Sequence, residues 1–227
     1  MEIQMIDTSD SRVRRVVLAG ATGLVGQHLL QDLLADERVS ELHALCRRDL
    51  AIKHPKLVVH QIDFKALPPL PPVDEAYLAL GTTIRDAGSQ AAFRAVDFDA
   101  NLAVAQAAIA AGAKRIGLVS AAGANAHSRV FYNRVKGELE EALAELNTDA
   151  LLIARPSLLL GDRVALGQAP RIAEKLTAAV LRLFGPAMPP GIRPVEARRV
   201  AHALSSQLHS TRGQVVLSSA QIQTCLR

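Results

Sequence analysis

The sequence predicts an α/β fold in which helices cover both faces of a doubly wound parallel sheet. Short apolar runs rich in β-branched residues alternate with stretches of helical periodicity, an alternation typical of parallel βαβ units. A glycine-rich turn joins the first apolar run to the first helical stretch. With 227 residues, 49% of them hydrophobic, the chain is long enough for one sizeable core and a small C-terminal lobe.

Hydrophobic periodicity places the elements in order along the chain. Apolar runs predict strands at residues 13–18, 41–45, 57–62, 75–80, 115–119, 150–154 and 215–217. Helical periodicity predicts helices near residues 24–34, 89–111, 130–146, 169–184 and 195–208. Gly112 directly follows the second of these helices, as a C′ glycine does.

The turn after the first strand reads Gly20-Ala21-Thr22-Gly23-Leu24-Val25-Gly26. In such a turn, Gly20 permits the tight bend, Gly23 lets the backbone approach a pyrophosphate, and Gly26 lets the helix pack closely on the sheet. The helix N-terminus, with Thr22 as its expected N-cap, offers free N–H groups and a positive dipole end to phosphates. The turn therefore predicts a Rossmann-like dinucleotide site, with Leu24 and Val25 in the first helical turn beside it.

Two arginines follow the second strand, in the sequence Cys46-Arg47-Arg48. An NAD-preferring site usually has an acidic residue at this place, where it holds the ribose hydroxyls. Guanidinium groups instead offer planar, bidentate donors to a 2′-phosphate. Arg47 and Arg48 therefore favour NADP(H) as the cofactor. The alternative is that one or both arginines are only solvated surface charges, and this alternative applies more readily to Arg48 than to Arg47.

Two further strand ends carry candidate cofactor contacts. The fourth strand stops at Gly81-Thr82-Thr83, where Gly81 lets the backbone run under a cofactor. Thr82 and Thr83 either bond to ribose or phosphate or make local turn bonds. The sixth strand ends at Arg155-Pro156, and Pro156 directs the chain toward the nicotinamide end of the expected cleft.

A Tyr/Lys pair on the helix at residues 130–146 carries the expected chemistry. Tyr132 and Lys136 are four residues apart and therefore share one helix face. The pKa of a free phenol is about 10, and a neighbouring ammonium favours the phenolate. Tyr132 is then expected to exchange a proton with a carbonyl or alcohol while hydride moves to or from nicotinamide. Lys136 is also expected to bond to the nicotinamide ribose.

A serine ends the fifth strand about a dozen residues before Tyr132. The Ser120 hydroxyl is expected to hold the oxygen of a substrate carbonyl, with a local turn bond as the alternative. Ser120 is followed by two alanines. If the residue that faces the substrate carbonyl is Ala122 instead of Ser120, the site lacks its serine.

The chain resembles the atypical short-chain dehydrogenases/reductases, in particular the NADPH-binding Tat-interacting-protein-like oxidoreductases and their bacterial relatives. The matching stretches cover nearly the whole chain after residue 12; they are LAGATGLVG, ALCRRD, LALGTT, FRAVDFD, GAKRIGLVSAAGAN, YNRVKGELE, RPSLLLGDR and RPVEARRVAHAL. The resemblance implies NADP(H) binding in a doubly wound sheet but implies no particular substrate. Many members of the superfamily dimerise, so a homodimer is among the expected assemblies.

The resemblance also implies roles for residues that spacing alone does not assign. Asp63, after the third strand, is expected to meet the adenine amine beside an apolar Phe64, or alternatively to cap a turn. The superfamily often places an asparagine in the helix after the fourth strand, where it supports a water relay to the lysine. Here Asp97 holds that position, so we expect a different proton path.

Composition excludes several classes of protein. The pI is near 9.4, but only 3% of residues are aromatic and the arginines form no single stripe, so we expect no nucleic-acid partner. No apolar run approaches the ~20 residues of a membrane span, and the first dozen residues lack a signal-peptide core. The two cysteines form neither metal-site spacing nor a disulfide framework, so we expect no metal and a cytoplasmic location.

We therefore expect a flexible N-terminus at residues 1–12, a dinucleotide-binding core at residues 13–156 and a substrate-side lobe at residues 157–227. The favoured function is that of an NADP(H)-dependent oxidoreductase that reduces a small carbonyl compound. Two alternatives stay open. One is a regulator that senses NADPH with little catalysis, and the other is an epimerase of the nucleotide-sugar type.

Overall fold

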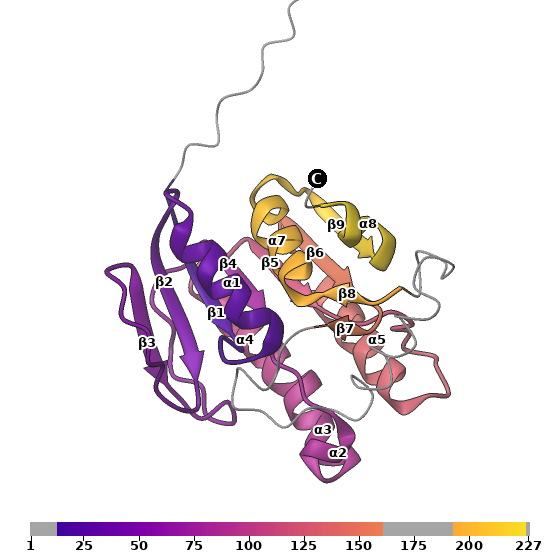
Figure 1. Ribbon diagram of the computed structural model, residues 1–227. Helices are drawn as coiled ribbons and strands as arrows, with labels where there is room; N and C mark the ends of the chain where they lie inside the picture. Colours follow the sequence, from indigo (N-terminus) through magenta and orange to yellow (C-terminus); the bar gives the residue numbers. More distant parts are fainter. Residues whose placement is uncertain (1–12, 161–192, 226–227) are drawn as a thin grey trace, which may run out of the picture.

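The structure, a computed structural model, describes residues 13–160 and 193–225 (Figure 1). Within these residues a seven-stranded parallel sheet has the order β3-β2-β1-β4-β5-β6-β9, which confirms the doubly wound α/β fold. The strands are β1 (Arg14–Ala19), β2 (Val39–Cys46), β3 (Leu57–Gln61), β4 (Glu75–Leu78), β5 (Arg115–Val119), β6 (Ala150–Arg155) and β9 (Gly213–Ser218). The expected flexible N-terminus at 1–12 and helix at 169–184 lie outside the described residues.

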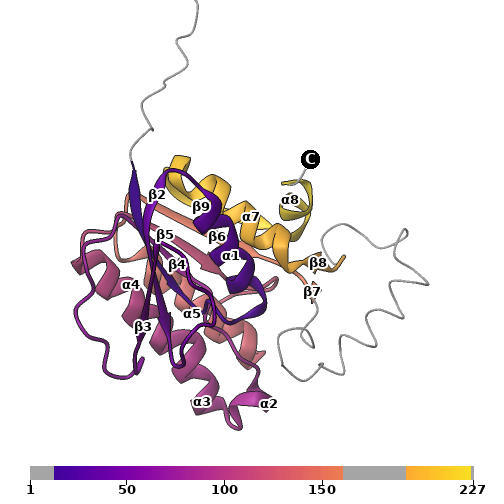
Figure 2. The ribbon, with the colours of Figure 1, turned by 60° about the vertical axis from the view of Figure 1, so that its left-hand side comes forward.

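Helices cover both faces of the sheet (Figure 2). One face carries α1 (Leu24–Ala35) and α7 (Ala197–Gln207), and the other carries α4 (Asn101–Ala110) and α5 (Phe131–Ala144). Along β1, Val16 and Leu18 pack toward the first pair of helices, whereas Val17 and Ala19 pack toward the second. Because both faces are buried, the strand reads in the sequence as a continuous apolar run rather than an alternating one.

The C-terminal part of the described chain belongs to these same layers. The helix α7 packs beside α1, and β9 pairs with β6 at one edge of the sheet. A separate two-stranded sheet is formed by β7 (Leu159–Leu160) and β8 (Val195–Glu196). The short elements η3 (Leu208–Ser210) and α8 (Ser219–Thr224) complete the described C-terminal region.

The long helix expected at residues 89–111 is divided into three pieces. After α2 (Ile84–Ala87), the chain forms α3 (Gln90–Arg94), a π-helical segment η1 (Ala95–Ala100) and then α4. Ser89 caps α3 by accepting a hydrogen bond from the Ala92 N–H, and Gly112 follows α4 with a φ of 105°. The two ends of the predicted helix were therefore correct, and its uniform interior was not.

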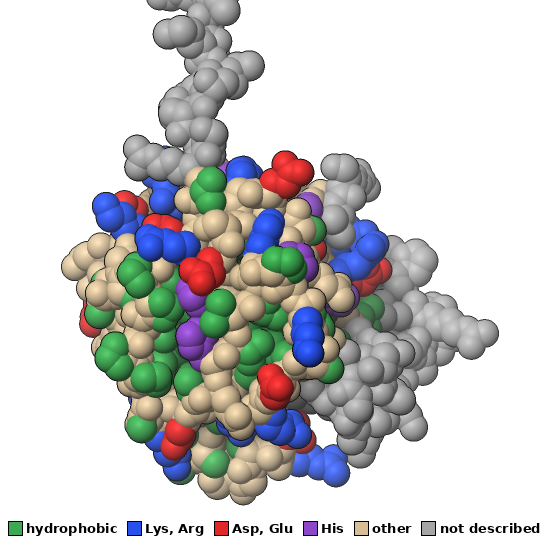
Figure 3. Space-filling view, turned by 90° about the vertical axis from the view of Figure 1, so that its left-hand side faces the viewer, with side chains coloured by type: hydrophobic (Ala, Val, Ile, Leu, Met, Phe, Trp, Pro, Cys, Tyr) green, Lys and Arg blue, Asp and Glu red, His purple; other side chains and the backbone are tan. Residues whose placement is uncertain are grey.

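At the other edge of the sheet, β3 is joined to β2 by a pair of histidines. His43 Nδ1 and His60 Nε2 lie 3.0 Å apart, and Glu41 approaches His43 Nε2 at 3.4 Å. Figure 3, which views the molecule from the β3 side, shows histidine and hydrophobic side chains close together on this face. Burial is the largest cause of the lowered pKa of His43, so this imidazole is neutral at pH 7.

Among the described residues, every helix is too short or too polar to span a lipid bilayer.

Candidate cofactor and catalytic site

The glycine turn between β1 and α1 has the backbone conformation that its sequence predicts. Gly20 has a φ of 95°, and a Cβ at this position would lie 2.4 Å from the Ala79 carbonyl oxygen. A Cβ on Gly26 would lie 1.9 Å from the Gly20 carbonyl oxygen. Side chains at these two positions are therefore excluded by the packing of the turn itself, and the turn brings the N-terminus of α1 against the end of β4.

The expected N-cap of α1 was wrong. The capping residue is Gly23 rather than Thr22, and no side chain caps the helix. The Gly23 N–H donates to the Gly20 carbonyl at 2.9 Å, so the turn closes through backbone alone and Thr22 is exposed. Leu24 and Val25 are buried in the first turn of the helix.

The neighbouring strands β1 and β4 mark the point where the strand order reverses. In doubly wound sheets, ligands bind outside the carboxyl ends of the strands at such a switch point. The loop after β4 contains Gly81, Thr82 and Thr83. Thr83 accepts from the Asp86 N–H as the cap of α2, and the Thr82 hydroxyl donates to the Thr83 carbonyl at 3.4 Å. Both threonine hydroxyls thus make the local bonds that the sequence left as one alternative.

The ends of β2 and β3 form the other side of the switch point. Arg47 and Arg48 are exposed, and neither forms an ion pair with a described residue. The Asp63 carboxylate accepts from the Lys65 N–H at 3.0 Å, which is the turn-capping alternative for this residue. Phe64 packs against the core on the α4 and α5 side of the sheet.

Tyr132 and Lys136 lie on the first two turns of α5. The Tyr132 ring packs against Phe93 of α3 with ring centroids 5.5 Å apart. Lys136 is buried, and its Nζ lies 2.7 Å from Asp97 Oδ1 in η1. Burial alone would lower the pKa of Lys136, but the Asp97 carboxylate and the Tyr132 oxygen raise it above its usual value. Lys136 is therefore an ammonium that lies close to the Tyr132 phenol.

The Ser120 side chain contacts α5 at Glu140, about two turns after Tyr132. Its hydroxyl donates to the buried carboxylate of Glu140, which also pairs with Arg155 through Nε at 3.1 Å. Glu140 is eight residues after Tyr132, about 12 Å along the helix axis. The Ser120 hydroxyl therefore donates its proton to Glu140. Ala122, the alternative position, is exposed.

The strands β5 and β6 are held together beside this cluster. The Ala122 N–H donates to the Pro156 carbonyl at 2.8 Å, and the Ser120 N–H donates to the Ala154 carbonyl at 2.8 Å. Pro156 is buried, and Arg155 is occupied by its ion pair with Glu140.

Two features of the site were missed in the sequence. Gly137 follows Lys136, and a Cβ there would lie 2.1 Å from the Ala126 backbone nitrogen, so the loop at residues 121–129 packs directly on α5. Glu140 repeats the four-residue spacing of Tyr132 and Lys136, and this spacing was the available signal for a buried acid on the same face. No local signal marks Gly137, because the clash is with a distant segment.

Sequence comparisons place the chain among known proteins. No family model matches it. The protein fmp52 of Aspergillus niger is 33% identical over 180 residues, which are 75% of this chain and 75% of that protein. The fmp52 protein of Emericella nidulans is 36% identical over 160 residues, 65% of this chain and 68% of that protein. The chain belongs to the FMP52 family.

A mammalian protein also matches the chain. HTATIP2 of Rattus norvegicus is 35% identical over 157 residues, 66% of this chain and 64% of that protein. The chain spans 64% of the length of the Candida glabrata FMP52 protein and 66% of that from Coccidioides immitis.

The expected cytoplasmic location is contradicted by these relatives. The FMP52 proteins of Candida glabrata, Coccidioides immitis and Emericella nidulans are designated mitochondrial. Free cysteines separate reducing from oxidising surroundings, but they do not separate one reducing compartment from another, so the sequence argument could not decide the location.

Solved structures share the fold at low sequence identity. MoeE5 in complex with UDP-glucose and NAD has a TM-score of 0.68 and 18% identity, over 89% of this chain and 75% of that one. The UDP-N-acetylglucosamine 4-epimerase of Methanobrevibacter ruminantium has a TM-score of 0.67 and 14% identity, over 91% of this chain and 77% of that one.

Proposed function

We propose that the protein binds NADP(H) at the carboxyl end of its sheet and reduces a small carbonyl compound. In this proposal Tyr132 donates the proton, and the Lys136 ammonium stabilises the negative charge that forms on the phenol oxygen. The resemblance of the sequence to atypical short-chain dehydrogenases/reductases supports such a reaction.

A series of contacts across the switch point carries this proposal. The glycine turn lies against the end of β4, where Gly20 approaches Ala79. A few residues later, the Thr82 N–H donates to Asp97 Oδ2 at 2.8 Å, and Asp97 Oδ1 pairs with Lys136 at 2.7 Å. These contacts connect the expected phosphate-binding turn with Lys136 through the end of β4, which supports hydride transfer next to a proton donor.

The described residues fit a dinucleotide. Gly20 and Gly26 keep the turn free of side chains, and the N-terminus of α1 has no side-chain cap, so its first N–H groups are available to phosphate oxygens. MoeE5, which has this fold, is described in complex with NAD. We therefore assign the glycine turn, with Thr22, Gly23, Leu24 and Val25, to the diphosphate.

The arginines after β2 favour NADP(H) over NAD(H). Arg47 and Arg48 are exposed and form no ion pair with a described residue, so both guanidiniums are available to a 2′-phosphate. We assign Asp63 and Phe64 to the adenine end of the same site. The remaining expected contacts, which stay part of this proposal, are those of Gly81, Thr82, Thr83, Arg155 and Pro156.

The chemistry follows from the positions of the side chains. A bound nicotinamide cofactor supplies the hydride. Tyr132 donates its phenol proton to the carbonyl oxygen, so the product is an alcohol and the proton is replaced from solvent. Lys136 keeps its positive charge beside the phenol oxygen and stabilises the negative charge that forms there. Because Ser120 donates its proton to Glu140, we assign Ser120 to the support of this cluster rather than to the carbonyl.

Titration calorimetry with NADPH and NADH tests the cofactor. We expect NADPH to bind more tightly than NADH. Arg47→Ala should weaken NADPH binding by about tenfold or more, since a hydrogen bond to a charged group contributes about 1.5–3 kcal/mol. Arg212→Ala is the matched control, because Arg212 is exposed and precedes β9 at the opposite end of the sheet. Failure of both nucleotides to bind would overturn the proposal.

A carbonyl-substrate screen with NADPH tests the reaction. Tyr132→Phe should abolish NADPH oxidation while NADPH affinity stays within about twofold, because the phenol is the proton donor and not a cofactor ligand. A screen that finds turnover unchanged in Tyr132→Phe would remove Tyr132 from the mechanism. Binding without turnover in the native protein would favour the NADPH-sensing alternative.

A further inference from the structure

The ion pair between Asp97 and Lys136 is among the most deeply buried charged contacts of the described chain. The two side chains are 1% and 5% exposed, and Asp97 Oδ1 lies 2.7 Å from Lys136 Nζ. Aspartate and lysine are almost never fully buried unless they are paired, because each charge loses its hydration. Lys136 thus depends on a carboxylate partner to remain charged where it is.

The residues around Asp97 fix the position of the carboxylate that pairs with Lys136. Asp97 lies in η1, where i→i+5 hydrogen bonding interrupts the α-helix, and such segments occur frequently at functional sites. The second carboxylate oxygen accepts from the Thr82 N–H at 2.8 Å. Asn101 Nδ2 donates to the Asp97 carbonyl at 3.1 Å and to the Leu80 carbonyl at 3.2 Å, which links η1 to the end of β4.

The other charged and titratable neighbours of Lys136 do not replace Asp97. On α5 these neighbours are Tyr132 and Glu140, one turn to either side. Glu140 is already paired with Arg155 and accepts from Ser120. Among the described residues, Asp97 therefore supplies the carboxylate that directly contacts the Lys136 ammonium.

We propose that Asp97 is a positioning residue of the Tyr132/Lys136 pair, whose carboxylate holds the Lys136 ammonium in place and ties it to the loop that contains Thr82. This inference rests on the proposed function, in which that loop lies under the cofactor. It assigns to the acid a role distinct from a water relay: the carboxylate keeps the lysine charged and sets its distance from the phenol.

Replacement of Asp97 by asparagine removes the negative charge of the side chain and keeps its size and shape. The amide oxygen can still accept from the Thr82 N–H, but the amide group offers no negative charge to Lys136. A buried ammonium without a counter-ion loses its proton more readily. Lys136 in Asp97→Asn should therefore become neutral at a lower pH than in the native protein, and the effects that need its charge should fade as the pH rises.

Nitrogen-15 NMR of the lysine ammonium groups tests this directly on the full chain. The chain contains six lysines, and Lys136→Met identifies the signal of Lys136. We expect the Lys136 ammonium signal to persist through pH 9 in the native protein and in Asp99→Asn, a matched control with an exposed acid two residues away. In Asp97→Asn the signal should disappear at a lower pH, and Asp97→Glu should restore its persistence.

NADPH affinity gives a second readout. In Asp97→Asn, Kd should rise by about tenfold between pH 7 and pH 9, whereas the native protein and Asp99→Asn should change by less than about twofold. A Lys136 signal with the same pH dependence in Asp97→Asn and native protein would overturn the inference. If Asp97→Asn does not fold, two other results overturn the inference. One is loss of the Lys136 ammonium signal below pH 9 in the native protein, and the other is its loss below pH 9 in Asp97→Glu. A native protein that binds no NADPH refutes the proposed function but leaves the NMR result decisive.

Discussion

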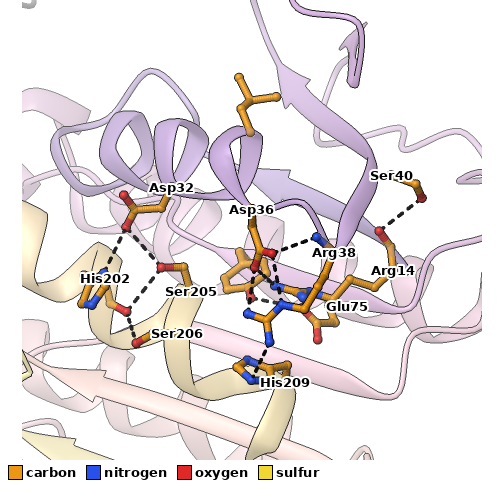
Figure 4. Close-up of polar contacts among 12 residues, drawn as sticks. Arg14, Asp32, Asp36, Arg38, Ser40, Glu75, His202, Ser205, Ser206 and His209 are labelled. Carbon is orange, nitrogen blue, oxygen red and sulfur yellow. Dashed lines mark hydrogen bonds and ion pairs between the residues drawn. The ribbon is translucent and has the colours of Figure 1, made fainter. Parts of the chain in front are cut away.

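Arg14 is buried at the amino end of β1, at the opposite end of the sheet from Lys136. Its Nε donates to Glu75 at 3.0 Å and its Nη2 donates to Asp36 at 2.7 Å (Figure 4). The Tyr77 hydroxyl donates to the same Glu75 oxygen at 3.1 Å, and Arg38 also pairs with Asp36 at 3.1 Å. This network joins β1, β4 and the end of α1, so it stabilises the fold away from the proposed site.

Loss of the Arg14 guanidinium should be costly because it leaves the buried Glu75 carboxylate without its ion-pair partner. We expect Arg14→Met to lower the free energy of unfolding by about 3–5 kcal/mol. Arg15→Met is the matched control, since the Arg15 and Asp74 side chains are 41% and 43% exposed and such a pair contributes about 0–1 kcal/mol. Urea denaturation measures both, and equal effects of the two variants would contradict this assignment.

The helix α5 connects the site residues with the packing of a distant loop. Tyr132, Lys136 and Glu140 share one face, while Gly137 allows the backbone of Asn125 and Ala126 to approach the helix. A side chain at Gly137 would push this loop away from the turn that carries Lys136. The glycine is thus explained by a tertiary contact and runs against helix propensity.

Gly137→Ala sets helix propensity against packing. In a free helix, alanine would be more stable than glycine by about 1 kcal/mol. Here the added Cβ would lie 2.1 Å from Ala126 N and 2.2 Å from Asn125 C, and overpacking costs about 1–3 kcal/mol or more. We therefore expect a net loss of stability in urea denaturation. The exposed Glu141→Ala should change stability by less than about 0.5 kcal/mol, and a stabilised Gly137→Ala would disprove the contact.

At the scale of the whole molecule, carboxylates set the pH dependence of stability. Burial raises the pKa of Asp36, but the hydrogen bonds from Arg38 and Arg14 outweigh it and hold this pKa below its usual range. The pKa of Asp74 is likewise lowered by Arg15, against the effect of burial. A carboxylate with a lowered folded-state pKa contributes stability above its unfolded pKa and loses it as the pH falls toward the folded value.

We therefore expect the free energy of unfolding to decrease as the pH falls below about 4, where the unfolded chain takes up protons first. Glu75 acts in the opposite direction, because burial raises its pKa and its ionised form is the costly one. Urea denaturation at pH 3 to 7 measures this decrease at acid pH, which we call the acid limb. Asp36→Asn should make the acid limb shallower, whereas Asp99→Asn should leave it unchanged. An acid limb that is as steep in Asp36→Asn as in the native protein would rule out Asp36 as its source.

The order of elements was readable from local patterns, but their fine structure was not. The apolar runs predicted β1, β2, β3, β4, β5, β6 and β9, because strands buried on both faces are continuous in sequence. The helix expected at residues 89–111 appeared uniform because alanine-rich periodicity does not distinguish α-helical from π-helical hydrogen bonding. Thr22 looked like a cap for a similar reason: residue type alone does not reveal that the Gly23 backbone closes the turn.

By itself, the sequence determined the doubly wound fold, the glycine turn and the shared face of Tyr132 and Lys136, because each depends on spacing along one segment. Only the tertiary structure decided what these residues contact. Asp97 in η1 pairs with Lys136 in α5, and the Ser120 hydroxyl donates to Glu140. Such contacts join segments far apart in the chain, and their geometry depends on how the helices pack on the sheet rather than on any local pattern.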